Sequence, residues 1–275
     1  MNKGHIRYIR PPQLEGLEIQ EVVNSNHSFP NHTHSIHSVG FMAAGGCYCR
    51  QPGHGSSFIR KGEIALFNPG FVHSGVIDNP DTRITYRVFS FENELIKKLS
   101  QELAQKDTLP EFTDVVIQDK LASSTLTNLC KAVAAPDNEG ESRLALDTAL
   151  SSAIAALVTR HSAFHSKVPQ TKEPVAVERT KEYLHANMSD KVTLEKLSEV
   201  AGLSRYHLLR VFKQQVGLSP HNYHLQLRIE QSKRLLRQGT SYAQVAAESG
   251  FTDQSHFSNT FRKYTGATPG QYAQV

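Results

Sequence analysis

The stretch VAGLSRYHLLRVFKQQVGLSPHNY (residues 200–223) recurs near the end of the chain as ESGFTDQSHFSNTFRKYTGATPGQY (residues 248–272). Gly202 corresponds to Gly250, and after one inserted residue a phenylalanine, a second glycine, a proline and a tyrosine recur in the same order. Such repetition indicates that one supersecondary unit occurs twice. Each copy reads as a helix, a glycine turn and a second helix, so about the last hundred residues are predicted to be all-α.

Capping residues and apolar spacing define the helices of each copy. Thr193 and Ser204 can each cap a helix in the first copy, and Gly202 can adopt the positive φ of the turn between these helices. In the second copy, Thr252 or Asp253 can cap the second helix. The residues at helical spacing that are predicted to face inward on the two second helices are Leu208, Val211 and Phe212 in one copy, and Phe257, Thr260 and Phe261 in the other.

The outward faces of the two second helices carry side chains suited to reading base edges in the major groove. Arginine pairs with guanine O6 and N7, and asparagine and glutamine pair with adenine N6 and N7. The predicted DNA-contacting residues are Ser204, Arg205, Tyr206, Arg210 and Lys213 in the first copy and Gln254, Ser255, Ser258, Asn259 and Arg262 in the second. For a single copy a merely solvated helix face is the alternative, and the recurrence of the pattern favours DNA recognition.

The segment between the two copies has the length of a useful spacer. Residues 220–238 could form one helix of about 19 residues, which spans roughly 28 Å. Major-groove segments on one face of a duplex recur every ~34 Å. A helical spacer of this size can therefore present both second helices to successive turns of one double-stranded DNA molecule.

The distribution of charge supports this interpretation. Residues before Thr171 contain 16 Lys and Arg against 17 Asp and Glu, whereas the rest of the chain contains 14 against 9. The net charge of +4 therefore resides in the repeated part, as expected of a nucleic-acid-binding domain. A chain of 275 residues is long enough for two domains, each with its own core.

Composition excludes several other classes of protein. No apolar run approaches the roughly 20 residues of a membrane helix, and the first residues lack the apolar core of a signal peptide. Three cysteines do not make a disulfide framework, and Cys47 and Cys49 are expected to be reduced thiols. We therefore expect a cytoplasmic bacterial protein, associated with the nucleoid when bound to DNA, with no membrane partner.

The first part of the chain has a different texture. Residues 16–91 contain short apolar or alternating runs separated by Gly, Pro and Asn turns, which is typical of an all-β barrel or sandwich. Helical periodicity begins at Glu92. One later stripe, Leu146, Ala149, Leu150, Ala153, Ile154 and Leu157, must be buried either against the barrel or in a helix-helix dimer seam. The polar segment 165–174 carries two prolines and is the predicted linker.

The repeated part resembles the AraC family of bacterial transcriptional regulators. The resemblance rests on three features in a fixed order: SRYHLLRVFK, GLSPHNYHLQLRIEQSKRLL and AESGFTDQSHFSNTFRKYTGATPGQY. It implies that Tyr206 and Arg210, and Gln254, Ser255, Ser258 and Asn259, lie where family members touch bases. Leu209 is apolar where the family often has a polar group, so the first reading helix is expected to contact fewer base edges.

The resemblance also implies an organisation for the whole chain. We expect a two-domain, α+β protein: a cupin-like β-barrel with accessory helices for effector binding and dimerisation at 1–164, the linker at 165–174, and an all-α domain with two helix-turn-helix units at 175–275. Family members commonly respond to a small molecule in the barrel and act as homodimers. The expected function is a DNA-binding regulator, an activator that contacts RNA polymerase, and not an enzyme.

Three histidines in the stretch FPNHTHSIHSVG (residues 29–40) raise the question of a metal site. Alternation along a strand allows His32 and His34 to share a face and places His37 on the other. His73 could supply a third imidazole, which suits zinc or iron, but no Asp or Glu occurs between Glu21 and Glu63 to complete the carboxylate-containing set of metal-binding cupins.

No metal and no cofactor are therefore assigned from the sequence, although structural histidines and a metal site both stay open as alternatives. The residues assigned to effector binding are His32, His34, His73, Tyr86 and Arg87, and the sequence leaves open which of the last two points inward. The alternative functions are a metal-dependent cupin enzyme fused to the DNA-binding domain, and a sensor of metal or of thiol oxidation at Cys47 and Cys49.

Overall fold

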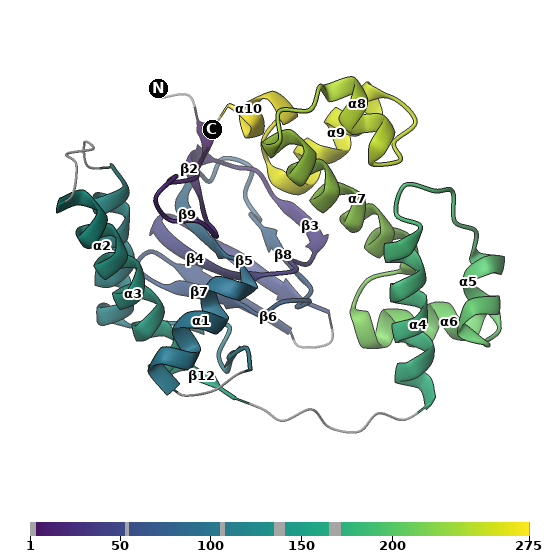
Figure 1. The fold of residues 1–275 in the computed structure, drawn as a ribbon, viewed down its shortest axis with the longest axis horizontal. Helices are drawn as coiled ribbons and strands as arrows, with labels where there is room; N and C mark the ends of the chain where they lie inside the picture. Colours follow the sequence, from purple (N-terminus) through teal and green to yellow (C-terminus); the bar gives the residue numbers. More distant parts are fainter. Residues whose placement is uncertain (1–3, 53–54, 105–107, 135–140, 165–171, 275) are drawn as a thin grey trace.

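The computed structural model describes residues 4–52, 55–104, 108–134, 141–164 and 172–274, which fold into a β-rich lobe and a helical lobe (Figure 1). The strands of the first lobe are β1 (His5–Ile9), β2 (Leu17–Ser25), β3 (Phe29–His32), β4 (His37–Ala44), β5 (Gly46–Gln51), β6 (Gly55–Arg60), β7 (Ile64–Phe67), β8 (His73–Val76), β9 (Ile84–Phe91), β10 (Glu111–Phe112), β11 (Val116–Ile117) and β12 (Ser162–Ala163). The predicted β texture of residues 16–91 is confirmed.

Two antiparallel sheets face each other and form the barrel. One has the strand order β1-β2-β9-β4-β7-β11 and the other has the order β3-β8-β5-β6. Side chains alternate across the first sheet, so Met42, Ile84 and Tyr86 point between the sheets, whereas Val39, Phe89 and Phe91 point outward. The first sheet is therefore buried on both faces.

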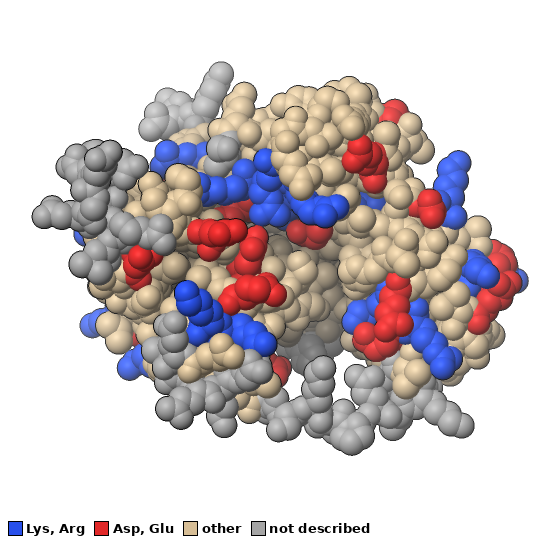
Figure 2. Space-filling view, viewed as in Figure 1, with Lys and Arg blue, Asp and Glu red and all other residues tan. Residues whose placement is uncertain are grey.

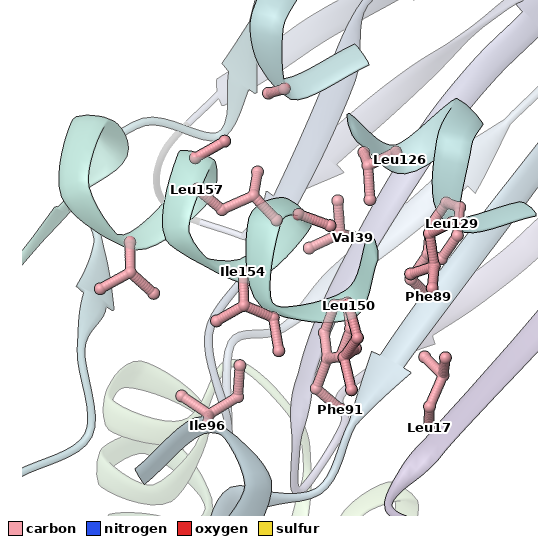
Figure 3. Close-up of a cluster of buried hydrophobic side chains, with 14 of the residues drawn as sticks. Leu17, Val39, Phe89, Phe91, Ile96, Leu126, Leu129, Leu150, Ile154 and Leu157 are labelled. Carbon is pink, nitrogen blue, oxygen red and sulfur yellow. The ribbon is translucent and has the colours of Figure 1, made fainter. Parts of the chain in front are cut away.

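Three helices cover the outward face of the six-stranded sheet: α1 (Asn93–Ala104), α2 (Lys120–Ala134) and α3 (Glu141–His161) (Figure 1). In Figure 3 Leu150, Ile154 and Leu157 of α3 point toward Phe89 and Phe91 of the sheet. The stripe predicted on α3 is thus buried within the chain, except for half-buried Ala149. Of the two alternatives for this stripe, packing against the barrel is confirmed for its buried residues, and only half-buried Ala149 of the stripe is left at the surface.

Asp119 joins the start of α2 to the end of α3. Its Oδ1 accepts hydrogen bonds from the backbone of Leu121 and Ala122, at 2.8 and 3.2 Å, and so caps α2. Its Oδ2 accepts from His161 and from Arg160, whose Nε lies 2.7 Å away. Mainly through the His161 contact, and also through Arg160, these partners hold the pKa of the carboxyl well below its usual value.

Replacing Asp119 with asparagine is expected to lower the free energy of unfolding by about 1–2 kcal/mol at pH 7, because charge-assisted bonds become neutral ones. The folded-state pKa is depressed, so this stability is present above the unfolded pKa of about 3.9 and is lost as the pH falls through the folded pKa. Urea unfolding at pH 7 and at lower pH measures the difference, with exposed Asp81→Asn as the control. A loss that is unchanged in acid would contradict this account.

The helical lobe contains α4 (Lys172–Ala186), α5 (Leu194–Ala201), α6 (Arg205–Val216), α7 (Pro220–Arg237), α8 (Tyr242–Glu248), α9 (Gln254–Thr265) and α10 (Pro269–Ala273). Helix α4 begins at Lys172, so residues 172–174 belong to a helix and not to the linker, which is a correction. Pro174 lies in the first turn, where a missing N–H leaves no hydrogen bond unmade. The rest of the expected linker, 165–171, lies outside the described residues. None of the described helices is long and apolar enough to cross a bilayer.

Candidate functional site

The first helix-turn-helix unit consists of α5 and α6. The Thr193 side chain accepts from the Lys196 N–H and caps α5, and the Ser204 side chain accepts from the His207 N–H and caps α6. Between them Gly202 has a φ of 66°, in the left-handed region that glycine adopts at little cost. Leu208, Val211 and Phe212 are buried in the core between α4, α5 and α6. The predicted unit is therefore confirmed in its caps, its turn and its inward face.

The second unit, α8 and α9, repeats this construction. Asp253 caps α9 by accepting from the His256 N–H at 2.7 Å, so of the two candidate caps Asp253 is the one used. Phe257 and Phe261 are fully buried, and Thr260 is half-buried at the edge of the inward face. The two units have separate apolar cores and are connected by α7.

The outward faces of α6 and α9 are exposed and polar. The exposed residues among those predicted to contact DNA are Ser204, Arg205, Arg210, Lys213, Gln254, Ser255, Asn259 and Arg262. Ser258 is half-buried, and the Tyr206 side chain lies outside the described residues. Arg205 pairs with Glu195 of α5, so its guanidinium must leave that partner to reach a base. Among the described residues Arg210 has no acidic partner, and its Nη2 lies 3.4 Å from His207 Nδ1.

A cavity of about 140 Å³ lies inside the barrel, which is room for a ligand of roughly one aromatic ring. Strands from both sheets line it, and Lys233 of α7 and Tyr264 and Thr265 of α9 reach it from the helical lobe. Among the residues predicted to bind an effector, His32, His34, His73 and Tyr86 line this cavity. The cavity therefore belongs to both lobes.

Arg87 is a correction, because it does not line the cavity. It follows Tyr86 on β9, and adjacent side chains on a strand point to opposite faces. Its guanidinium binds the Glu21 carboxylate at 2.7 Å on the outer face of the sheet. Burial in the cavity raises the pKa of Tyr86, so its hydroxyl is neutral and can donate a hydrogen bond.

Three histidine rings meet at one end of the cavity. The ring centroids of His32 and His73 are 4.3 Å apart, and those of His32 and His34 are 4.9 Å apart. Phe67 stacks on His73 at 3.8 Å. Burial lowers the pKa of all three histidines, to about 4 for His32, so the rings are neutral at pH 7.

His37 is separate from this group, as predicted, although it begins β4 and does not share a strand with His32, which ends β3. It lies on the helix-facing side of the sheet, where its Nε2 hydrogen-bonds to the Pro110 carbonyl at 2.9 Å and its ring contacts Phe112. Its role there is to fill the core between the sheet and the helices.

The two parts of the chain each match a described family. Residues 16–154 match the AraC-like ligand binding domain, and residues 197–274 match a helix-turn-helix domain. The HTH-type transcriptional regulator YbfI of Bacillus subtilis is 32% identical over 83% of this chain and 81% of its own length. The chain belongs to the AraC family of transcriptional regulators. It is a DNA-binding regulator with a ligand-binding domain, and its relatives are regulators and not enzymes.

Other AraC-family proteins show how far the likeness extends. GbdR of Pseudomonas aeruginosa is 33% identical over only 37% of this chain and 26% of its own length, so the match is confined to about one domain. Crystal structures of ToxT from Vibrio cholerae cover 98% of this chain and 96% of that chain with a TM-score of 0.58 and 14% identity. At that identity the likeness supports the two-domain fold alone.

The match to the ToxT structures extends over both domains of this AraC-family chain. In this chain the two domains are docked against each other through polar contacts. The Tyr8 hydroxyl and the Gln20 amide both donate to the Thr265 carbonyl at 2.9 Å. Tyr272 donates to Glu18, and Arg10 stacks over the Tyr272 ring. Figure 2 shows Lys and Arg side chains beside Asp and Glu side chains along the boundary between the lobes, as such pairing requires.

Gln226 makes the contact closest to the histidines. Its side-chain amide accepts from the Thr33 N–H at 3.1 Å and donates to the Thr33 carbonyl. Thr33 lies between His32 and His34, so α7 holds the backbone on which these two rings stand. No pattern in the sequence pointed to this role, because Gln226 is one polar residue among many on a basic helix.

The two cysteines in the barrel cavity are poorly suited to sensing oxidation. Cys47 and Cys49 both lie on β5 and line the cavity as free thiols. Burial raises the pKa of Cys47 to about 12 and that of Cys49 to about 11. Since the thiolate is the reactive form, both cysteines are poor candidates for sensing oxidants at neutral pH.

Proposed function

We propose that this regulator places α6 and α9 in successive major grooves of its operator, and that a small molecule in the barrel cavity controls DNA binding. The observation that carries the proposal is the pair of capped, exposed reading helices, joined by one 18-residue helix whose side chains also reach the cavity. At 1.5 Å per residue α7 spans about 27 Å, which suits the ~34 Å between successive major-groove segments on one face of DNA.

The reading role of α6 is tested at Arg210. Arg210→Ala is expected to relax base preference at specific operator positions by about 1–3 kcal/mol, because a guanidinium paired with guanine discriminates between bases. Arg262→Ala, near the end of α9, is expected to weaken binding to all sequences similarly and to reduce the salt dependence of affinity. Selection from a random DNA pool followed by binding titrations measures both. An unchanged base profile for Arg210→Ala would remove α6 as a reading helix.

The lining of the cavity indicates the chemistry of the effector. Most of the lining is apolar, with contributions from Phe67, Ile59 and Val88, while neutral imidazoles and the Lys233 ammonium supply the polar end. Such a cavity suits a small molecule with an apolar body and one anionic group. Carboxylic acids fit this description, and ToxT has been crystallised with an unsaturated fatty acid and with a naphthalenyl butenoic acid.

The regulation follows from the position of the cavity between the lobes. A ligand shifts an equilibrium between two arrangements only if it binds them with different affinity. An effector that contacts Lys233 and Thr265 together with barrel residues gains these contacts only when the lobes are docked. Such an effector therefore stabilises the docked arrangement. Docking restricts the movement of α7 and α9 and so changes how well the DNA-binding domain fits its operator.

Gln226→Ala tests this coupling. The substitution leaves the Thr33 N–H and carbonyl without their buried partner, which is expected to weaken docking by about 1–3 kcal/mol. DNA affinity should then depend less on the effector, while the base profile stays the same. Binding titrations with and without a carboxylic acid effector measure this, with exposed Arg234→Ala on the same helix as the control. An effector response of unchanged size would show that docking through Gln226 plays no part.

We also infer that the chain acts as a homodimer and as an activator that contacts RNA polymerase in the bacterial cytoplasm. A shallow groove between α2 and α3 offers small side chains to a second copy, from Thr125, Asn128, Ala132, Ala145, Thr148, Ala149 and Ser152. Light scattering tests the dimer, and a promoter reporter tests activation.

A further inference from the structure

The three histidines at the end of the cavity are arranged as ligands for one ion. One nitrogen from each of His32, His34 and His73 lies within 4.8 Å of one from each of the other two. Two of the three positions are fixed by the sheet, because His32 on β3 pairs directly with His73 on β8. His34 follows two residues after His32 and returns to the same side.

The other ring nitrogens have the partners that metal-binding histidines usually have. His32 Nδ1 lies 2.8 Å from the Pro30 carbonyl, and His73 Nδ1 lies 3.2 Å from the Phe71 carbonyl. A carbonyl can only accept, so each Nδ1 carries the proton and each Nε2 keeps a lone pair. Backbone carbonyls that fix the tautomer and orientation of a ligating imidazole are a common outer shell of metal sites.

The described residues supply no other hydrogen bond to these rings. The Nε2 lone pairs of His32 and His73, whose ring centroids are 4.3 Å apart, are therefore left without a protein donor among the described residues. Lys233 lines the cavity, but its ammonium is bound to Glu230 at 2.9 Å. A cation near both rings would satisfy the lone pairs together.

We propose that His32, His34 and His73 bind one divalent transition-metal ion of the zinc class, with an open coordination position that faces the cavity. Three neutral imidazoles favour such an ion over Mg²⁺ or Ca²⁺, which require oxygen ligands. Ligand nitrogens about 2.0–2.1 Å from a tetrahedral zinc lie roughly 3.3 Å from one another. The histidine nitrogens, which lie within 4.8 Å of one another, must therefore approach by up to about 1.5 Å. The missing carboxylate, which argued against a metal in the sequence, is what leaves the cavity-facing coordination position open.

The charge of the site determines what completes it. Glu18 lines the same cavity, but Arg10 binds its carboxylate at 2.7 Å and Tyr272 donates to it at 2.9 Å. The ion would therefore keep its full double charge and take an anion at the open position. This deepens and rests on the proposed function, because the carboxylate of an effector would be that anion.

Cobalt titration of the full chain without an affinity tag tests the site. After treatment with chelator, the wild-type protein is expected to take one equivalent of Co²⁺, with visible absorption typical of four- or five-coordinate cobalt, and to release it to Zn²⁺. His34→Ala and His73→Ala should each weaken binding by about 100-fold. His27→Ala is the matched control, since His27 also lines the cavity but binds the Lys263 carbonyl and lies outside the cluster.

The titration separates the two proposals. A wild-type chain that takes no stoichiometric Co²⁺ or Zn²⁺, or variants that bind as tightly as wild type, would overturn the metal site even if an organic acid still controls DNA binding. One equivalent of metal lost in the histidine variants, together with DNA binding that ignores organic acids, would keep the metal site and overturn effector control. Because the wild-type titration decides by itself, misfolding of a variant does not obscure the result.

Discussion

Replacing Arg228 with alanine is expected to lower the free energy of unfolding of the DNA-binding domain by about 2–4 kcal/mol and to weaken binding to a two-groove operator at least tenfold. The half-buried guanidinium donates to three backbone carbonyls: Nε to Met188 at 3.0 Å, Nη1 to Gly250 at 2.6 Å and Nη2 to Asp190 at 2.8 Å. Alanine leaves all three carbonyls without this partner.

The effect on DNA binding follows from where these carbonyls lie. Met188 and Asp190 belong to the segment before α5 in the first unit, whereas Gly250 is the turn glycine of the second. A Cβ at Gly250 would lie 2.4 Å from the Ser189 carbonyl oxygen, so the two units approach closely at this point. Arg228 thus fixes the distance between α6 and α9, which under the proposed function enter successive grooves together.

Urea unfolding and binding titrations on one-groove and two-groove DNA measure the Arg228→Ala effects. Arg228→Lys should recover little, because one ammonium cannot span three carbonyls. Arg234→Ala, on the exposed side of the same helix, should change stability by less than about 0.5 kcal/mol. Equal losses of affinity on one-groove and two-groove DNA would show that Arg228 stabilises the fold without setting the spacing of the units.

Replacing Ile154 with alanine is expected to lower the free energy of unfolding of the amino-terminal domain by about 2–4 kcal/mol. Ile154 is fully buried on α3 among Ile96, Phe91 and Leu150, as Figure 3 shows. Truncation removes buried methyl groups and leaves a cavity that the sheet and three helices close only in part. Thermal or urea unfolding measures the loss.

The same substitution distinguishes core packing from a dimer seam. If Ile154 lies in the core, the loss in free energy of unfolding does not depend on protein concentration, provided that the oligomeric state does not change. Exposed Ser151→Ala on the same helix serves as the control and should be nearly neutral. A variant that keeps wild-type stability but dissociates on dilution would return the stripe to the dimer interface.

Local patterns were sufficient for the DNA-binding domain. The caps at Thr193, Ser204 and Asp253 and the turn at Gly202 involve residues within a few positions of one another, so their geometry follows from short-range hydrogen bonding and sterics. His37 does lie apart from His32, as the sequence indicated, but not for the expected reason: the two residues stand on different strands, β3 and β4, so alternation along one strand does not relate them.

Alternation along β9 could not show which of Tyr86 and Arg87 points into the cavity. It shows that adjacent side chains point to opposite faces of the sheet, but not which face lines the cavity. The partner on the other strand decides this, and Glu21 of β2 lies on the outer face where Arg87 can pair with it. The role of Arg228 was likewise hidden, since its three acceptors lie 22 to 40 residues away in the chain.

The sequence by itself determined the family, the two helix-turn-helix units, their exposed polar faces and the β character of the first domain, since each is encoded in residues close together along the chain. Tertiary structure alone decided that α3 packs on the sheet, that Lys233 and Thr265 close the barrel cavity, and that His73 meets His32 and His34. These contacts join residues far apart in sequence, and their free energy depends on burial and distance, which exist only once the sheets have closed and the lobes have docked.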